Sequence, residues 1–387
     1  MLADNKLTEG SSWDERQLAV VLNELKIELN FEIEVPGFEP PEIDRLLRAL
    51  DPPDDSMEAA DEFEVAEGQA ISRLGDSWSL DRHRLFCGNA LESTAYDALL
   101  AGEKADAVFT DPPYNVPVNG HVTGKGRRKH REFAMASGEM TGEAFTRFLR
   151  DALGLAVSHS VEDATLFACM DWRHVVEIAS AIREIDCEIL NLCVWVKTNG
   201  GQGSLWRSQH ELLPVFKKGA EPHINNVELG RHGRWRSNVW EYAGASSLGS
   251  DAREGLALHP TVKPRLLLED ALIDVTNRGD IVIDCFAGSG STLVAAEATG
   301  RRCRAIEFDG PYCDVIIRRW SEMTGREAVL EATGETFAEV EARRSNEGPP
   351  DPAPQFGRVE GGVAPDEADE LPDHDTTGAT CNAEGRS

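Results

Sequence analysis

Between residues 75 and 344, short apolar runs alternate with longer helical patterns, and this alternation limits the possible folds more than any other feature. Strands that alternate with helices predict an α/β fold, in which a doubly wound, mostly parallel sheet carries helices on both faces. The strand-like runs are 107–110, 165–169, 192–196, 212–216, 281–285 and 303–308. The helical patterns are 143–159, 172–185, 264–276, 291–300 and 311–324. The short loop after 192–196 fits an adjacent antiparallel pair.

The flanking segments differ from this α/β region in pattern and charge. Residues 14–29 and 41–50 have the apolar periodicity of short helices, and residues 31–35 alternate as a strand does. Residues 51–74 are acidic and predict a linker, and residues 345–387 predict a disordered tail. Most of the net charge of −29 lies in these flanks, so the central region can still carry a basic face.

The composition argues against a membrane protein and against a disulfide framework. No window of eighteen consecutive apolar residues occurs, and residues 1–12 lack the apolar core of a signal peptide. The eight cysteines form no C-x-x-C pair and no cluster with zinc-binding spacing. We therefore expect a cytoplasmic protein with reduced cysteines and no metal site.

A glycine loop leads from the apolar run 281–285 into the helical pattern 291–300. Gly288 and Gly290 permit a tight turn and let backbone amides approach a ligand. Glu307 ends the next strand, where a carboxylate can accept hydrogen bonds from both hydroxyls of a ribose. The loop has neither the G-x-G-x-x-G pattern nor a Walker lysine. These features predict a nucleoside-type cofactor without phosphates.

A second loop, Asp111-Pro-Pro-Tyr114, directly follows the strand-like run 107–110. Ligands of open α/β sheets bind beyond the carboxyl ends of the strands. Pro112 and Pro113 have a fixed φ, so their carbonyls are held rigidly. The Asp111 carboxylate and the Pro112 carbonyl would each accept one hydrogen of an exocyclic amine and free its lone pair. Tyr114 would stack on a base swung out of a duplex.

Together these loops resemble the DNA amino-methyltransferase family, which methylates adenine-N6 or cytosine-N4. Asp111-Pro-Pro-Tyr114 is similar to the family's catalytic motif, and Asp284-Cys-Phe-Ala-Gly-Ser-Gly290 to its cofactor motif. The order of the two motifs, with 259–264 just before the second, resembles the β class. The resemblance extends over residues 84–331 and implies S-adenosylmethionine as cofactor and a Rossmann-like, seven-stranded sheet of class I. An aspartate at position 111 resembles the adenine enzymes more than the cytosine enzymes.

The resemblance also implies roles for single residues. Thr261 and Lys263 would lie near the methionine end of the cofactor, where Lys263 could pair with its carboxylate. Asn89 stands where the family commonly has an aspartate near the adenine of the cofactor. The expected catalytic residues are Asp111, Pro112, Pro113 and Tyr114. The expected cofactor residues are Asn89, Asp284, Phe286, Gly288, Gly290, Thr292, Glu307, Thr261 and Lys263.

Two basic stretches, 125–131 and 230–238, predict contacts to DNA phosphates. The first follows the catalytic loop, and the second lies in a candidate target-recognition segment, about 200–258. Trp235 and Trp240 are candidate wedges or stacking surfaces. The expected contact residues are Lys125, Arg127, Arg128, Lys129, Arg131, Arg231, Arg234 and Arg236.

Residues 1–50 resemble the tail of a ParB-like domain, which is fused ahead of some phage and prophage methyltransferases, so we expect a truncated form of a longer protein. The expected partner is double-stranded DNA, and the resemblance adds a homodimer and a cognate restriction nuclease as candidates. Alternatives to adenine are cytosine-N4, RNA or a protein amide. A non-catalytic DNA-binding protein with the same fold is a further alternative, whereas the glycine spacing disfavours a nicotinamide dehydrogenase.

Overall fold

The computed structural model describes residues 15–28, 40–48, 70–116, 136, 138–198, 200, 205–229, 236–242, 263–345 and 347. The strand expected at 31–35 and the tail beyond 347 lie outside the described residues. None of the helices in the described parts of the chain combines the length and the apolar character that a membrane crossing needs.

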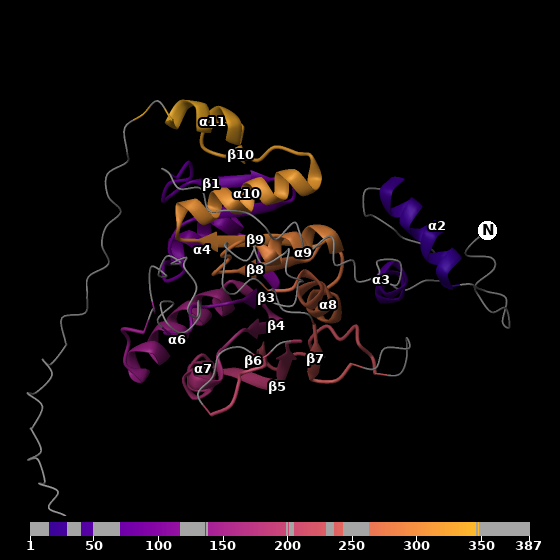
Figure 1. The fold of residues 1–387 in the computed structure, drawn as a ribbon, viewed down its shortest axis with the longest axis vertical. Helices are drawn as coiled ribbons and strands as arrows, with labels where there is room; N and C mark the ends of the chain where they lie inside the picture. The colour runs from indigo at the N-terminus through magenta and orange to yellow at the C-terminus, as the bar shows by residue number, and fades with distance from the viewer. Residues whose placement is uncertain are drawn as a thin grey trace, which may run out of the picture. The chain divides into compact units, whose positions relative to one another are not determined.

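One sheet forms the centre of the described structure, and its strand order is β10-β1-β2-β9-β8-β3-β4-β6-β5-β7 (Figure 1). Strands β2, β9, β8, β3 and β4 run parallel, whereas β6 is antiparallel to both β4 and β5. The expected antiparallel pair is therefore confirmed. The bounds are β1 (Ser77–Leu80), β2 (His83–Cys87), β3 (Ala105–Thr110), β4 (Ser160–Ala168), β5 (Cys187–Val196), β6 (His210–Lys218), β7 (Val239–Glu241), β8 (Ile281–Asp284), β9 (Arg302–Glu307) and β10 (Val329–Leu330).

The sheet is wider than the seven strands expected. The expected sheet corresponds to the part from β2 to β5, and β1, β10 and β7 extend its two edges. These three strands have four residues or fewer. Segments this short carry no apolar periodicity of their own, so the sequence pattern did not reveal them. The expected fold class, a mostly parallel α/β sheet, is confirmed.

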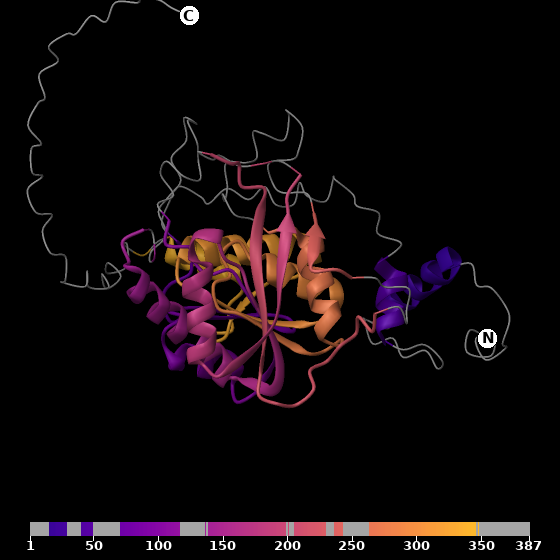
Figure 2. The ribbon, with the colours of Figure 1, turned by 90° about the horizontal axis from the view of Figure 1, so that it is seen from below.

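Helices cover both faces of the sheet, as the alternation predicted (Figure 2). One hydrophobic core contains α8, α9 and α10, and a second core on the opposite face contains α4, α6 and α7. The bounds are α2 (Glu15–Glu28), α3 (Pro40–Arg48), α4 (Ser93–Leu100), α6 (Gly142–Ser158), α7 (Val175–Glu184), α8 (Arg265–Val275), α9 (Ser291–Thr299), α10 (Gly310–Thr324) and α11 (Phe337–Arg344). A short 3-10 turn (Trp172–His174) precedes α7. The Asp171 side chain caps this turn by accepting from the Arg173 backbone N–H.

The two N-terminal helices, α2 and α3, form a small apolar cluster of their own. The buried Asp44 on α3 accepts from Arg301 at 3.0 Å and also pairs with Arg278. These ion pairs tie α3 to the ends of α8 and α9. The end of the predicted linker differs from expectation: the backbone N–H groups of Ile71 and Ser72 donate to Asp314 on α10 at 2.7 and 2.8 Å. Residues 70–74 are therefore part of the sheet domain.

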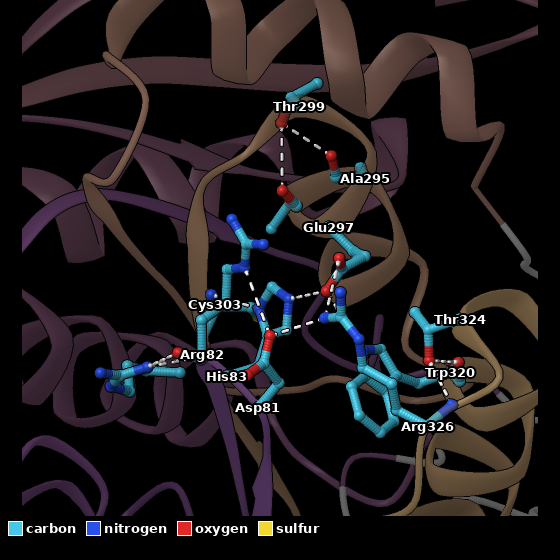
Figure 3. A network of polar contacts seen from close by, with 12 residues as sticks. Asp81, Arg82, His83, Ala295, Glu297, Thr299, Cys303, Trp320, Thr324 and Arg326 are labelled. Atoms are coloured by element: carbon cyan, nitrogen blue, oxygen red, sulfur yellow. Dashed lines mark hydrogen bonds and ion pairs between the residues drawn. The ribbon is translucent and has the colours of Figure 1, made fainter. Parts of the chain in front are cut away.

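A buried polar network joins β2 to α9, β9 and α10 (Figure 3). The His83 ring accepts from the Cys303 backbone N–H through Nδ1 at 2.9 Å, so its proton lies on Nε2. Nε2 then donates to the Glu297 carboxylate at 2.7 Å. The Trp320 indole donates to the same carboxylate at 3.2 Å. Burial lowers the pKa of His83, which keeps the ring neutral. The network holds β2 beside β9, the strand that ends at Glu307.

Replacement of His83 by alanine tests this network. The change leaves the buried Cys303 N–H without its acceptor and the buried Glu297 carboxylate with one donor fewer, so we expect a loss of roughly 2–4 kcal/mol in the free energy of unfolding. Arg326→Ala is the matched control, because Arg326 is half exposed and approaches the same carboxylate only to 3.9 Å. Its loss should stay below about 1 kcal/mol. Urea unfolding measures both values, and equal losses would contradict the proposed importance of the buried network.

Candidate active site

The carboxyl ends of β3, β8 and β9 lie side by side, since β8 pairs in parallel with both neighbours. Asp111 follows β3, Asp284 ends β8 and Glu307 ends β9. The Thr110 hydroxyl at the end of β3 donates to the Asp284 carboxylate at 3.1 Å. The structure thus brings residues 111–114, which we call the catalytic turn, and the glycine loop to one edge of one sheet. About 170 residues separate them in the chain.

The Asp111 carboxylate is held on both of its oxygens. Oδ1 accepts from the Tyr114 hydroxyl at 2.6 Å, and Oδ2 accepts from the Lys263 ammonium at 2.6 Å. Burial raises the pKa of Asp111, and the charge of Lys263 acts in the opposite direction. Because the ammonium pairs with it directly, we describe Asp111 as an oriented carboxylate that still has acceptor capacity for a ligand amine.

Lys263 bridges two carboxylates. Its ammonium pairs with Asp111 and, at 2.9 Å, with Glu211 on β6. Its expected place near the methionine end of the cofactor stays a prediction. Glu211 also pairs with Lys197, the residue that follows β5. Lys263 is therefore a partner of the catalytic turn.

The charges of this cluster favour ionised side chains. Burial opposes ionisation of Glu211, but Lys263 and Lys197 outweigh it and lower the pKa of Glu211 to about 2. Burial would lower the pKa of Lys263, but the carboxylates Asp111 and Glu211 raise it above its ordinary value. Burial, with the same two carboxylates, raises the pKa of Tyr114 well above its ordinary value. The tyrosine is thus a neutral hydrogen-bond donor.

Asn115 shapes the end of the catalytic turn. Its backbone has a positive φ of 52°, a conformation that asparagine tolerates better than most residues. Its side-chain amide donates to the Met140 carbonyl at 2.8 Å, and its carbonyl accepts from the N–H groups of Gly138 and Met140 at 3.1 Å. These bonds anchor the turn to the segment that precedes α6.

Two carboxylates, the buried Asp284 and the half-buried Glu307, organise the glycine loop. The Asp284 carboxylate accepts from the backbone N–H of Phe286 at 3.1 Å and also bonds the Thr292 side chain. The two oxygens of Glu307 accept from the N–H groups of Gly288 and Asp309, each at 2.8 Å. Burial raises the pKa of Asp284 to about 6 and that of Glu307 to about 7.

Two glycines in this loop have conformations that other residues rarely adopt. Gly288 has a φ of 52° and Gly290 a φ of 82°. A Cβ on Gly290 would lie 2.9 Å from the Ile316 side chain on α10. The close approach of α10 therefore requires glycine at position 290, as the sequence predicted for a tight turn.

The expected Asn89 site borders this loop, because the N–H of the adjacent Gly88 donates to the Glu307 carbonyl at 2.9 Å. The Asn89 side chain is buried and bonds the Leu91 N–H at 3.0 Å and the Glu92 carboxylate at 3.3 Å. Its amide is therefore engaged locally. Of the expected cofactor residues, Thr261 lies outside the described residues.

The expected DNA contacts fall mostly outside the described residues, namely Lys125, Arg127, Arg128, Lys129, Arg131, Arg231 and Arg234. Arg236 is described, and its guanidinium pairs with Asp274 at 2.9 Å and with Asp270 at 3.3 Å. These pairs give it a role in the fold, and its contact to DNA stays a prediction. Trp240 is 6% exposed, so the prediction that it serves as a wedge is wrong for this conformation. Trp235 lies outside the described residues.

Comparison with known proteins identifies the class. Residues 105–318 match the family profile described as DNA methylase, so the chain belongs to this family. Residues 16–74 match a profile described as the ParB-methyltransferase HTH domain, which confirms the ParB-like resemblance of the N-terminal region. The family membership confirms the expected DNA methyltransferase and its cofactor, S-adenosylmethionine.

Two curated relatives resemble the chain over more than half of its length. The Type II methyltransferase M2.DpnII of Streptococcus pneumoniae is 27% identical over 229 residues, which cover 56% of this chain and 82% of the relative. The Type II methyltransferase M2.LlaDCHI of Lactococcus lactis subsp. cremoris is 26% identical over 230 residues, with the same coverage of both chains.

Solved structures of similar proteins include the M1.HpyAVI–SAM complex, with a TM-score of 0.45, 18% identity, and coverage of 61% of this chain and 97% of that chain. The putative DNA modification methylase TTHA0409 of Thermus thermophilus, complexed with S-adenosyl-L-methionine, has a TM-score of 0.43 and 21% identity. The match covers 66% of this chain and 96% of that chain. The PvuII DNA methyltransferase, described as cytosine-N4-specific, has a TM-score of 0.45 and 14% identity with the same coverage.

Three residues that the structure places at the catalytic turn were not among those expected from the sequence: Asn115, Lys197 and Glu211. A signal for one of them was present. Glu211 directly precedes the apolar run 212–216, and an acidic residue at the start of a buried strand needs a partner. The partner itself was not visible in the sequence, because Lys263 is about 50 residues away.

Gly290→Ala tests the packing of the glycine loop, with Gly279→Ala as the matched control. Gly279 has nearly the same φ, 83°, but no atom within 4 Å of an added Cβ. The control should lose about 1–2 kcal/mol of stability from backbone strain alone. Gly290→Ala should lose roughly 1–3 kcal/mol more, because Ile316 must move. Thermal unfolding gives the difference, and calorimetry should show weaker S-adenosylmethionine binding only for Gly290→Ala. Equal behaviour of the two variants would refute the packing argument.

Proposed function

We propose that this protein transfers a methyl group from S-adenosylmethionine to the exocyclic N6 amine of adenine in DNA, on a base flipped out of the duplex. The observation that supports this most strongly is the juxtaposition of the Asp111 carboxylate with the glycine loop through the Thr110–Asp284 hydrogen bond. It puts a fixed hydrogen-bond acceptor for an amine next to the expected cofactor loop.

The protein's own residues would accept hydrogen bonds from the target amine and orient it. The Asp111 carboxylate and the Pro112 carbonyl would each accept one amine hydrogen, so that the nitrogen lone pair is no longer delocalised into the ring. The cofactor supplies an electrophilic methyl carbon on a sulfonium, whose sulfur keeps the bonding electron pair when the methyl leaves. The amine nitrogen forms the new bond to carbon and releases one proton to solvent. Tyr114 would stack on the base.

The residues of the loop fit a nucleoside-type cofactor. Each Glu307 oxygen accepts one backbone N–H and keeps a lone pair for a ribose hydroxyl. Gly288 and Gly290 have positive φ values and no side chain, so a ligand can approach the backbone of this loop closely. Asp284, Phe286, Thr292 and Asn89 border the same loop, and we propose them as further cofactor residues.

The choice of adenine rests on the aspartate at position 111, which resembles the adenine enzymes. To test it, unmethylated duplex DNA is incubated with the protein and tritiated S-adenosylmethionine, and the digested nucleosides are identified by mass spectrometry. We expect N6-methyladenine. Labelled N4-methylcytosine would assign the cytosine reaction instead. If no nucleoside carries the label, the proposed function is refuted.

Asp111→Ala should lower kcat by at least about 100-fold, because an oriented polar group at the reacting atom is lost. Calorimetry should show that the variant still binds the cofactor.

A pH dependence follows from Glu307. Its pKa is raised to about 7 by burial, and the ionised form accepts ribose hydroxyls best. As the pH falls through 7 the carboxylate becomes protonated, so cofactor affinity should fall by up to about tenfold per pH unit below it and level off above it. Glu307→Gln should bind weakly at every pH and show no such slope. The exposed Glu322→Gln, on α10, should keep the wild-type profile. Equal affinity of the wild type at pH 6 and pH 8 would exclude this role.

The partners and the location of the protein belong to the same proposal. Double-stranded DNA is the substrate, and the basic stretches 125–131 and 230–238 are proposed to contact its phosphates. The family resemblance supports a homodimer, a cognate restriction nuclease and a cytoplasmic location.

A further inference from the structure

We infer that Glu211 is a positioning residue, which holds the Lys263 ammonium between two carboxylates and so orients Asp111 for the target amine. This inference rests on the proposed methyl transfer at Asp111. It concerns a residue on β6, far from both sequence motifs. Neither motif contains it.

Glu211 contacts three members of the catalytic turn and its surroundings. Its Oε2 lies 2.9 Å from the Lys263 ammonium and 3.1 Å from the Tyr114 hydroxyl oxygen, whose one hydrogen is donated to Asp111. Its Oε1 pairs with Lys197. The same ammonium and the same hydroxyl are the two groups that hold Asp111. Every bond that orients Asp111 through a side chain in this cluster therefore leads to a group that Glu211 also contacts.

Burial of these charged groups costs desolvation free energy, and this cost argues for a role in the reaction. Four charged groups meet at the catalytic turn, namely Asp111, Lys263, Glu211 and Lys197. The exposed fractions of the Glu211 and Lys263 side chains are 10% and 5%. Apolar side chains of similar volume commonly stabilise a protein as well as a buried ion pair does, or better. A second buried ion pair, Asp44–Arg301, joins α3 to the end of α9 and does not touch the turn.

The Lys263 ammonium, which Asp111 and Glu211 share, also influences the ionisation of Asp111. The groups that face Asp111 are Lys263, Glu211, Tyr114, Cys169 and Asp284. Lys263 favours the ionised form of Asp111, whereas the negative charge of Glu211 disfavours it. With Glu211 neutralised, Lys263 would pair with Asp111 alone, and Asp111 would become a weaker acceptor for an amine. With Lys197 removed, Glu211 would draw Lys263 away from Asp111.

Two variants should therefore shift the pH profile of kcat in opposite directions. Activity requires ionised Asp111 and falls as the pH falls through its pKa. Glu211→Gln removes a like charge, so the pKa of Asp111 decreases and the acid limb of kcat moves to lower pH. Lys197→Met removes a positive charge from Glu211, so the pKa of Asp111 increases and the acid limb moves to higher pH. A purely structural role would lower the stability of both variants without opposite shifts.

The experiment is steady-state methylation of duplex DNA by the full-length protein across pH. We expect kcat of Glu211→Gln to fall about 10- to 100-fold at neutral pH, with KM for DNA within about threefold of wild type. Glu211→Asp should recover part of the loss. Glu188→Gln is the matched control, because Glu188 lies on the adjacent β5 with a side chain that is 63% exposed, and it should behave as wild type.

The outcomes separate this inference from the proposed function. If Glu211→Gln keeps wild-type kcat and pH profile, the positioning role is wrong while the methyl transfer stands. If Glu211→Gln does not fold, Lys197→Met decides, and an unshifted acid limb in that variant overturns the inference. If the wild type itself methylates no DNA, the proposed function has failed, and the inference fails with it.

Discussion

The parallel pairing of β3, β8 and β9 is the constraint on which the candidate site depends. Parallel strands end at the same edge of a sheet, so residues that follow them meet even when they are far apart in the chain. The register Val108↔Ile283 and Asp284↔Ala305 sets which side chains face each other there. A slip of one residue would turn Asp284 to the other face of the sheet and break its bond with Thr110. The two helical layers bury both faces of these strands and so hold the register.

The second constraint is electrostatic. A carboxylate that faces a buried site loses solvation, and it stays ionised only if a cation is close. At this sheet edge Lys263 supplies that cation for Asp111, and Glu211 shares it. Among the described residues, no such cation pairs with the acids of the glycine loop, and burial raises the pKa values of Asp284 and Glu307. Burial also raises the pKa of Asp111, against the charge of Lys263, whereas Lys263 and Lys197 lower the pKa of Glu211. The acids of the catalytic turn therefore differ from those of the glycine loop in their direct ion pair with a buried cation.

The N-terminal region adds a physical link between two parts of the chain. Residues 16–74 match the ParB-methyltransferase HTH domain, and Asp44 in this region pairs with Arg301 and Arg278 of the methylase domain. Arg301 is fully buried, and its guanidinium also donates to the Thr276 and Thr299 carbonyls at 2.7 Å. A buried guanidinium with these partners anchors α3 to the turns that follow α8 and α9.

The sequence alone determined the α/β class, the two loops and the need for glycine at 288 and 290, because periodicity and backbone conformation are local properties. That each loop follows a strand was also visible in the sequence, and parallel topology brings such loops to one edge of the sheet. Only the tertiary structure decided the partners of Lys263, the place of Glu211 and the burial of Trp240. A charged or aromatic side chain takes its role from whichever groups the fold brings within a few ångströms, and these groups come from distant parts of the chain.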